Sequence, residues 1–251
     1  MVLGVEAAAI GVAATVALAV LAAVGRALTR FAATVAAAFG CVIVVLAGFP
    51  FLALLALFVV VSALATRYRF EEKRSRHVQE GMSGERGISN VVAHIVVPTG
   101  LAVVAAAAPG RVPDVTVLYA SALAFGTSDT LASEFGVLSG HARSILTGRP
   151  VEPGTNGGVS GTGQLFALAG ALFVAAAAVP LFRLFATPTL PVAPFVAVVA
   201  AAGFLGCQLD SVLGELLENR GWLSKGSTNF LGMLGAVGLA YGLLRAGGVA
   251  P

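Results

Sequence analysis

The chain has 251 residues, of which 58% are apolar and only 11% charged, and its mean hydropathy is +0.94. A soluble domain carries about 25% charged residues, so this chain has too little charge to cover a water-exposed surface. The same figures exclude a disordered chain and a disulfide-rich secreted fold. They favour an all-α polytopic membrane helix bundle. In such a protein, lysine and arginine set the orientation in the membrane, so the net charge of +3 does not indicate a nucleic-acid partner, and none is expected.

Eight apolar segments are long enough to cross the hydrocarbon core, which takes about 20 residues of helix. They are residues 3–24, 31–48, 50–66, 89–108, 114–136, 162–182, 190–210 and 228–245. The stretch from Phe31 to Thr66 is too long for one helix, and Gly48-Phe49-Pro50 supplies the break that makes it a hairpin. The sequence therefore predicts about eight transmembrane helices, with seven as the alternative.

Lysine and arginine are divided unevenly between alternate loops. Twelve fall on one side: Arg26, Arg30, Arg67, Arg69, Lys73, Arg74, Arg76, Arg86, Arg143, Arg149, Arg220 and Lys225. Three fall on the other: Arg111, Arg183 and Arg245. The positive-inside rule makes the richer side cytoplasmic, so we expect the N-terminus and the C-terminus outside. Glu6 precedes the first span and basic residues only follow it, unlike a cleaved signal peptide, so we expect this span to be retained.

We expect a single membrane domain over residues 1–251, with a three-span N-terminal region at 1–66 and a catalytic region at 80–235. The inner loops are long and hold nearly every polar residue outside the spans. These loops are 67–88, 137–161 and 211–227. The protein is therefore expected in the cell membrane as a multi-pass protein, with its active site facing the cytoplasm.

Two similar six-residue segments end the fifth and seventh spans. They are Asp129-Thr130-Leu131-Ala132-Ser133-Glu134 and Asp210-Ser211-Val212-Leu213-Gly214-Glu215. Ionisable residues in spans are costly and suggest function, although a carboxylate at a helix end can simply be solvated or paired with arginine. Asp129 and Glu134 are five residues apart, which is about 140° around a regular helix. They cannot share one pocket unless the helix breaks at Gly126 or Gly136, or one of them pairs elsewhere.

A glycine-rich stretch, residues 147–163, immediately precedes the sixth span. Open backbone N–H groups at a helix N-terminus make an anion site. The residues expected to bind phosphate are Gly154, Thr155, Asn156, Gly157, Gly158 and Ser160. The stretch lacks the Gly-Lys-Ser/Thr of a Walker A loop. We interpret it as a phosphate cradle, with a flexible linker as the alternative.

Arg86, Asn90 and His94 recur every four residues and so share one face where the fourth span begins. A guanidinium at the membrane surface suits a phosphate. For His94, a packed core histidine is the more common case. Lys225 and Asn229 open the last span at the same predicted face.

Three segments resemble the integral-membrane phytyl-phosphate kinase family: residues 128–136, 154–160 and 210–214, with weaker support from Arg86-x-x-x-Asn90-Val91-x-x-His94 and Asn229-Phe230. The likeness spans roughly residues 80–235. The Asp-x-x-Ala-Ser pattern is more distantly similar to dolichol and phytol kinases and to CTP-dependent phosphatidate cytidylyltransferases. The chain departs from the family at Leu131, Asn90, His94 and Glu215, where tryptophan, glutamine, asparagine and a small residue are usual.

The resemblance implies transfer of a phosphoryl group from a nucleoside triphosphate, with CTP expected, to a prenyl monophosphate such as phytyl or geranylgeranyl phosphate. It implies Mg²⁺, which we assign to Asp129, Glu134 and Asp210, with Arg143 as a further catalytic residue. The nucleotide is expected to meet Thr130, Ser133, Gly154, Thr155, Asn156, Gly157, Gly158, Ser160, Ser211, Lys225 and Asn229. The acceptor phosphate is expected to meet Arg86, Asn90 and His94.

Two related activities and one unrelated function remain as alternatives. A CTP-dependent prenol kinase would need a base beside the hydroxyl group. A lipid-phosphate cytidylyltransferase would instead release pyrophosphate. A membrane transporter would place its charged sites near the bilayer midplane, whereas here they gather at the predicted inner end.

Overall fold

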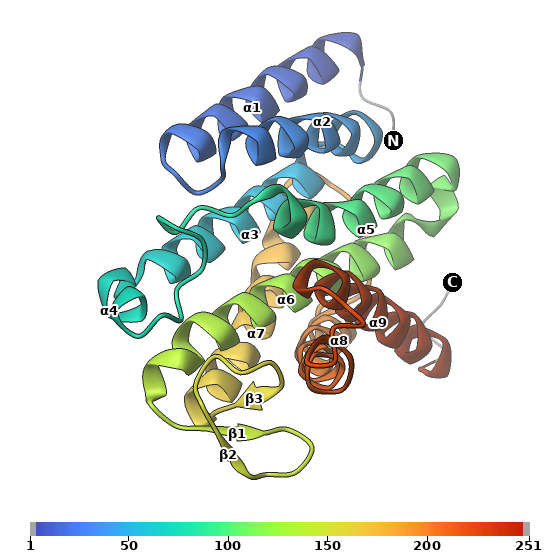
Figure 1. The fold of residues 1–251 in the computed structure, drawn as a ribbon. Coiled ribbons are helices and arrows are strands. Elements are labelled where there is room, and N and C mark those ends of the chain that lie inside the picture. The colour runs from blue at the N-terminus through green and yellow to red at the C-terminus, as the bar shows by residue number, and fades with distance from the viewer. Residues whose placement is uncertain (1–3, 248–251) are drawn as a thin grey trace.

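The computed structural model describes residues 4–247, and each of the eight predicted spans is a helix within them (Figure 1). The long helices are α1 (Val5–Val24), α2 (Arg30–Ala47), α3 (Phe49–Arg67), α5 (Ile88–Ala107), α6 (Val112–Gly136), α7 (Gly161–Leu184), α8 (Val192–Leu213) and α9 (Lys225–Ala246). Residue 3, where the first span was expected to begin, lies outside the described residues. The prediction of a polytopic helical membrane bundle is confirmed.

Within residues 4–247, seven of these helices are long and apolar enough to cross a membrane, and α6 is the long helix that is not among them. The difference lies in composition, because α6 carries many polar residues along its length. It is also covered by protein: 17 of its 25 residues are buried, and it packs against α3, α5, α7, α8 and α9. Two of its polar side chains bond to neighbouring helices: Tyr119 Oη donates to the Phe51 carbonyl (2.9 Å), and Ser128 Oγ donates to the Ala167 carbonyl (2.7 Å). A helix shielded from lipid can carry the polar residues of a site.

The helix boundaries follow local signals in the sequence. Thr29, Ser160 and Ser224 are N-caps whose hydroxyl oxygens accept backbone N–H bonds from the first turns of α2, α7 and α9. Gly48 has φ 93° and is followed by Pro50, so the chain turns sharply between α2 and α3, as predicted.

The loops that join the long helices at one end of the bundle contain structure that the sequence did not predict. They include α4 (Phe70–Ser75), the 3₁₀ turn η2 (Val137–Ser139), and a π-helical turn η3 (Gly214–Glu218) that continues α8. Strands β1 (Ala142–Ser144), β2 (Pro150–Val151) and β3 (Gly158–Val159) form an antiparallel sheet in the order β2-β1-β3. A further 3₁₀ turn, η1 (Pro109–Arg111), lies at the opposite end.

Contacts between distant loops define the two ends of the bundle. At one end Leu28 pairs with Arg86, and Lys225 bonds to Glu80. At the other end Asp114 pairs with Arg245. Helix α1 begins and α9 ends at this second end (Figure 1). The placement of these ends relative to the cytoplasm stays a prediction.

We expect Gly203→Ala to destabilise the protein, because α6 and α8 touch at this glycine. A Cβ at Gly203 would lie 2.6 Å from Ala124 Cβ and 2.9 Å from the Ala124 carbonyl carbon. Such overpacking costs about 1–3 kcal/mol of the free energy of unfolding. The matched control is Gly238→Ala, where a Cβ meets nothing within 4 Å. Thermal unfolding in detergent should show a lowered midpoint for the first variant only, and equal losses would contradict this packing.

Candidate functional site

A pocket of about 160 Å³ lies at the loop-rich end of the bundle, where α6 and α8 end and α7 and α9 begin. Twelve of the residues predicted from sequence line it: Asp129, Ser133, Gly154, Thr155, Asn156, Gly157, Gly158, Ser160, Asp210, Ser211, Lys225 and Asn229. They come from α6, α8, α9 and the loop that precedes α7. The structure therefore brings most of the predicted nucleotide site together.

Two carboxylates face this pocket, Asp129 from α6 and Asp210 from α8. Asp210 Oδ1 is buried and has no hydrogen-bond partner among residues 4–247. It lies close against α9, since a Cβ on Gly232 would be 3.0 Å from it. An unpaired buried carboxylate oxygen is costly and calls for a cation or a donor. Asp129 has four charged neighbours that act on it electrostatically: the cations Lys225 and Arg86 and the carboxylates Glu80 and Glu218.

The two aspartates fit a magnesium ion as part of a larger complex. Mg²⁺ typically takes one or two protein carboxylates and completes its shell with phosphate and water oxygens. No group of three or more His, Cys, Asp or Glu side chains within residues 4–247 is arranged to hold a metal. The protein would therefore supply two of the ligands and a bound polyphosphate the rest.

The glycine-rich loop is held directly against η3. Gly157 has φ 79°, and a Cβ there would collide with Glu215, so both its backbone conformation and its surroundings require glycine. Ser144 Oγ donates to Glu215 Oε1 (2.6 Å), and Asn219 Nδ2 donates to the Asn156 carbonyl (3.1 Å). These bonds fix the loop backbone, while the Asn156 side chain is exposed on the pocket side.

Ser160 has a structural role that the sequence did not assign. Its Oγ accepts a bond from the Gly163 N–H (3.0 Å) as the N-cap of α7 and donates to the Gly136 carbonyl (3.4 Å). The first turn of α7 therefore begins at the pocket wall, in the orientation that favours an anion.

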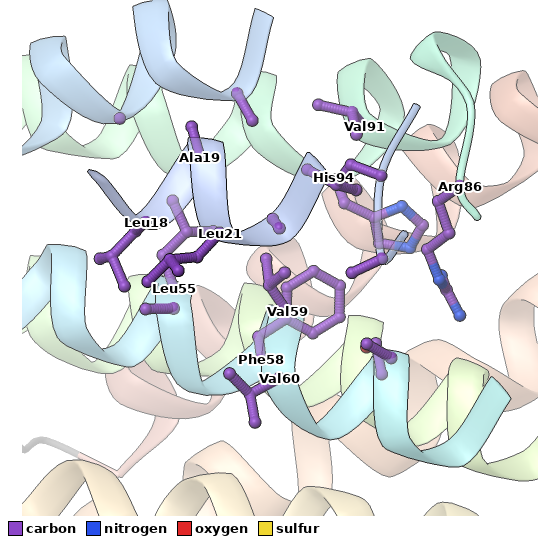
Figure 2. A pocket seen from close by; sticks show the side chains of 18 of the residues that line it. Leu18, Ala19, Leu21, Leu55, Phe58, Val59, Val60, Arg86, Val91 and His94 are labelled. Carbon is purple, nitrogen blue, oxygen red and sulfur yellow. The ribbon is translucent and has the colours of Figure 1, made fainter. Parts of the chain in front are cut away.

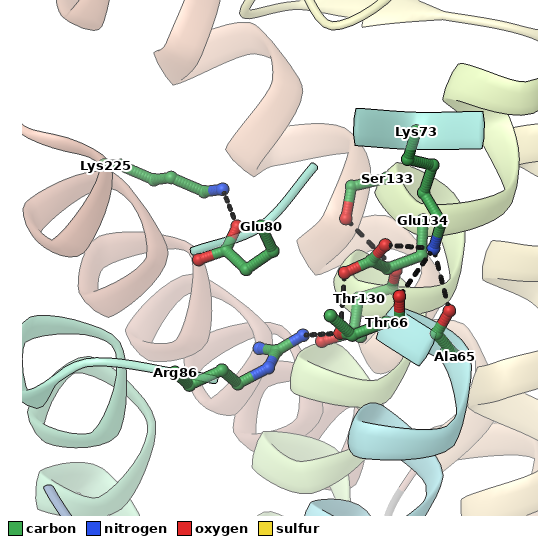
Figure 3. Close-up of polar contacts among 9 residues, drawn as sticks. All are labelled: Ala65, Thr66, Lys73, Glu80, Arg86, Thr130, Ser133, Glu134 and Lys225. Atoms are coloured by element: carbon green, nitrogen blue, oxygen red, sulfur yellow. Dashed lines mark hydrogen bonds and ion pairs between the residues drawn. The ribbon is translucent and has the colours of Figure 1, made fainter. Parts of the chain in front are cut away.

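Glu134 does not lie in the pocket, which corrects its assignment as a third metal ligand. Helix α6 is continuous through Gly126 and Gly136, so Glu134 points away from Asp129. Of the two predicted alternatives, a broken helix or an acid that pairs elsewhere, the structure has the second, and Glu134 is that acid. Thr66 Oγ1 donates to Glu134 Oε1 (2.6 Å), and Lys73 Nζ donates to Oε2 (2.6 Å), as Figure 3 shows. Both carboxylate oxygens are occupied, and the side chain is buried.

Lys73 was expected only to set topology, yet it is fully buried. Its Nζ also donates to the carbonyls of Ala65 (2.9 Å) and Thr66 (3.0 Å), so it caps the C-terminal end of α3 (Figure 3). A lysine within a run of basic residues carries no local signal of such a role. Its partner lies 61 positions away in the sequence.

Arg86, Asn90 and His94 share one face, as predicted, but they line a second cavity, of about 360 Å³, among α1, α2, α3 and α5 (Figure 2). Arg86 Nη1 donates to Asn90 Oδ1 (3.2 Å) and Nη2 to Thr66 Oγ1 (3.4 Å). His94 Nδ1 faces the Asn90 carbonyl at 2.9 Å. Apart from this polar group, the cavity wall is almost entirely apolar.

Two further predicted residues lie outside the pocket. Arg143, on β1, is exposed and donates to the Gly148 carbonyl of its own hairpin (3.0 Å). Thr130 is buried in the bundle, and its Oγ1 has no hydrogen-bond partner in the described part of the chain. Neither is placed to meet a ligand in the pocket.

Some lining residues were missed by the sequence analysis. Gln164 and Gln208 bond to each other from α7 and α8 (2.9 Å), and Gln164 faces the pocket. Glu218 also lines it. The spacing of Asp210, Gly214 and Glu218, each four residues apart, was the signal that could have placed Glu218 on the same face.

Lys225 is held by an ion pair with Glu80 in the loop between α4 and α5, at 2.7 Å (Figure 3). Burial alone would raise the pKa of Glu80, but the Lys225 ammonium, assisted by Arg86, holds that pKa below its ordinary value. Glu80 is therefore ionised at neutral pH and orients Lys225 at the edge of the pocket.

We expect Lys73→Met to lower the free energy of unfolding by about 3–5 kcal/mol, because it leaves Glu134 buried without its counter-charge. The double variant Lys73→Met/Glu134→Gln should recover part of the loss. The matched control is Arg74→Met, whose ion pair with Glu71 is at the surface and worth little. Thermal unfolding of the purified variants measures the difference, and a Lys73→Met protein as stable as Arg74→Met would refute the buried pair.

Comparison with known proteins places this arrangement among membrane proteins. The family model described as integral membrane protein DUF92 matches residues 13–236. An uncharacterized membrane protein of Methanocaldococcus jannaschii is 30% identical over 82% of this chain and 80% of its own length. Protein PGR of Arabidopsis thaliana is 32% identical over 71% of the chain and 68% of its own length. An uncharacterized membrane protein of a Synechocystis species is 33% identical over 75% and 73%. No solved structure matches the chain.

Proposed function

The chain belongs to the DUF92 family of integral membrane proteins, and from this starting point we propose that it is a phosphotransferase of the membrane. It transfers the γ-phosphoryl group of a nucleoside triphosphate, with CTP as the expected donor, to a prenyl monophosphate and yields the diphosphate. The observation that carries the proposal is the pairing of Asp129 and Asp210, one with an unpartnered buried oxygen, across from a glycine loop in one pocket.

The residues of the pocket suit phosphoryl transfer, which depends mainly on positioning and charge neutralisation. The N–H groups of Thr155 and Gly158 already donate to carbonyls of the loop. The other amides of the glycine loop and those at the start of α7 would bind the triphosphate. Asp129 and Asp210 would hold Mg²⁺, which when bound neutralises the phosphate charge. A phosphate monoester is already an anion near neutral pH, because its second pKa is about 6, so the acceptor needs no strong base.

Repulsion between donor and acceptor phosphates is the main obstacle, and two cations of this chain oppose it. Lys225 lies at the pocket edge, and Arg86 lies at the polar end of the apolar cavity. Both act on Asp129 electrostatically. Arg86 would therefore receive the acceptor phosphate while the lipid chain stays among the helices. We propose that this end of the bundle faces the cytoplasm, since it carries twelve of the fifteen basic residues.

Asp129→Asn is expected to lower the rate of phosphoryl transfer by at least about a hundredfold, because a bound metal supplies several kcal/mol of charge stabilisation. The matched control is Asp114→Asn on the same helix. Asp114 is buried at the opposite end beside Arg111 and Arg245, so its loss should spare the rate. The assay is formation of geranylgeranyl diphosphate from the monophosphate, CTP and Mg²⁺ by purified protein. Full activity of folded Asp129→Asn would remove the metal assignment.

Asn156→Ala is expected to raise the KM for the nucleotide about tenfold, because a hydrogen bond to a charged phosphate contributes about 1.5–3 kcal/mol. The side chain is exposed, and the loop is anchored through the backbone carbonyl of this residue, so the loop should keep its shape. The kcat at saturating nucleotide should stay near that of the native protein. An unchanged KM would contradict the role of the loop as a phosphate cradle.

A prenol kinase is the second candidate, and His94 favours it. His94 lines the apolar cavity, and its Nε2 is buried with no hydrogen-bond partner from residues 4–247, so it could accept a hydrogen bond from a hydroxyl group. Incubation with [γ-³²P]CTP and either the prenol or its phosphate separates the two kinases by which lipid becomes labelled. Transfer of the CMP moiety with release of pyrophosphate would instead identify a cytidylyltransferase.

A further inference from the structure

Three polar side chains that line the apolar cavity have an unpartnered buried atom within the described residues: Arg86, His94 and Ser62. The Ser62 hydroxyl can donate or accept, so the pair with fixed requirements is Arg86 and His94. Arg86 Nε and His94 Nε2 are both buried and have no hydrogen-bond partner within the described residues. Arg86 is 9% exposed and His94 2% exposed, and both line the cavity among α1, α2, α3 and α5 (Figure 2). Buried polar atoms are rarely left without partners. Their position therefore points to a ligand that supplies both an acceptor and a donor.

The neighbours of His94 determine which nitrogen carries its proton. Nδ1 faces the carbonyl of Asn90 at 2.9 Å, so Nδ1 must be the donor. The ring lies against Phe58 and Phe125, at centroid distances of 5.6 and 6.3 Å. The charged groups that act on it are Arg86 and Lys225 and, with the opposite sign, Glu80. A second proton on Nε2 would create a buried cation between apolar rings and beside another cation, which is strongly unfavourable. Nε2 is therefore an acceptor.

The rest of the cavity fits an apolar chain. Its wall includes Leu18 and Leu21 from α1 and Leu55 and Val59 from α3 (Figure 2). Its volume of about 360 Å³ lies within the range of small-molecule sites, which are commonly apolar with a few placed polar groups. Helix α1 packs chiefly against α2 and leaves many of its side chains exposed on the outer surface of the bundle. The cavity thus lies beside the lipid phase.

We propose that this cavity binds a single-chain lipid through its terminal hydroxyl. The hydroxyl oxygen accepts a hydrogen bond from Arg86 Nε, and its proton is donated to His94 Nε2. A prenyl alcohol and a singly protonated prenyl phosphate both present this group. The inference rests on the proposed function in that this lipid is the phosphoryl acceptor, and it makes His94 a residue that selects the head group.

The test compares three ligands of equal chain length on the full-length protein: geranylgeraniol, geranylgeranyl phosphate and geranylgeranyl methyl ether. Native mass spectrometry from detergent micelles measures occupancy without nucleotide or Mg²⁺. The ether lacks the hydroxyl proton, and we expect it to bind about tenfold more weakly than the better of the other two ligands. The identity of that better ligand distinguishes alcohol from phosphate. Equal binding of all three, or binding of none, would overturn the proposal.

Variants locate the effect. His94→Phe should abolish the difference between hydroxyl and ether, whereas His94→Gln, which keeps an acceptor oxygen, should retain part of it. Ala56→Phe fills the cavity and should weaken all three ligands, while Ala53→Phe, on the same helix but outside the cavity wall, should not. If a folded His94→Phe variant still binds the hydroxyl ligand more tightly than the ether, the assignment of His94 Nε2 as the hydrogen-bond acceptor is refuted.

The experiments distinguish failure of the lipid-site proposal from failure of the kinase proposal. Selective binding without phosphoryl transfer would reject the kinase activity and would still support the lipid site. Phosphoryl transfer with no dependence of head-group selection on His94 would reject the lipid site alone.

Discussion

An unbroken helix cannot direct two side chains five residues apart into the same space, and this constraint governs the site. On α6 the angle between Asp129 and Glu134 is about 140°, so the aspartate faces the pocket while the glutamate faces α3 and α4. The same division appears at the end of α8, where Asp210 faces the pocket and Glu215 binds the loop around β1. In both places the aspartate lines the pocket, while the nearby glutamate bonds to the surrounding chain.

The buried network around Glu134 links the two cavities. Lys73 closes the end of α3 and pairs with Glu134, which in turn accepts a bond from Thr66. The Thr66 hydroxyl oxygen also accepts a hydrogen bond from Arg86 Nη2. A continuous series of hydrogen bonds therefore runs from the helix that carries Asp129 to the arginine at the mouth of the apolar cavity, and it fixes that guanidinium in place. Such a network gives Glu134 a positioning role in place of metal binding.

The sequence predicted the membrane helices well because the bilayer imposes their length. Predicted and observed ends differ by at most three residues, from Val5 at the first helix to Ala246 at the last. Most of the pocket was predicted too, since polar residues at helix ends and glycines before a helix are local patterns. Lys73 could not be placed, because its partner Glu134 is distant in sequence. Arg143 could not be placed either, because it lies on a strand of three residues whose formation depends on contacts with other segments. Only the register of β1 with β2 and β3 turns Arg143 away from the pocket.

The light packing of α1 has a consequence for how a ligand reaches the protein. This helix forms one wall of the apolar cavity, yet it packs chiefly against α2 and only slightly against α3. Its weak side is therefore the boundary between α1 and α3. If the cavity binds the proposed lipid, an opening on this side would let it enter by diffusion within the plane of the bilayer. Its mole fraction in the leaflet, rather than its solubility in water, would then set how often the cavity is filled.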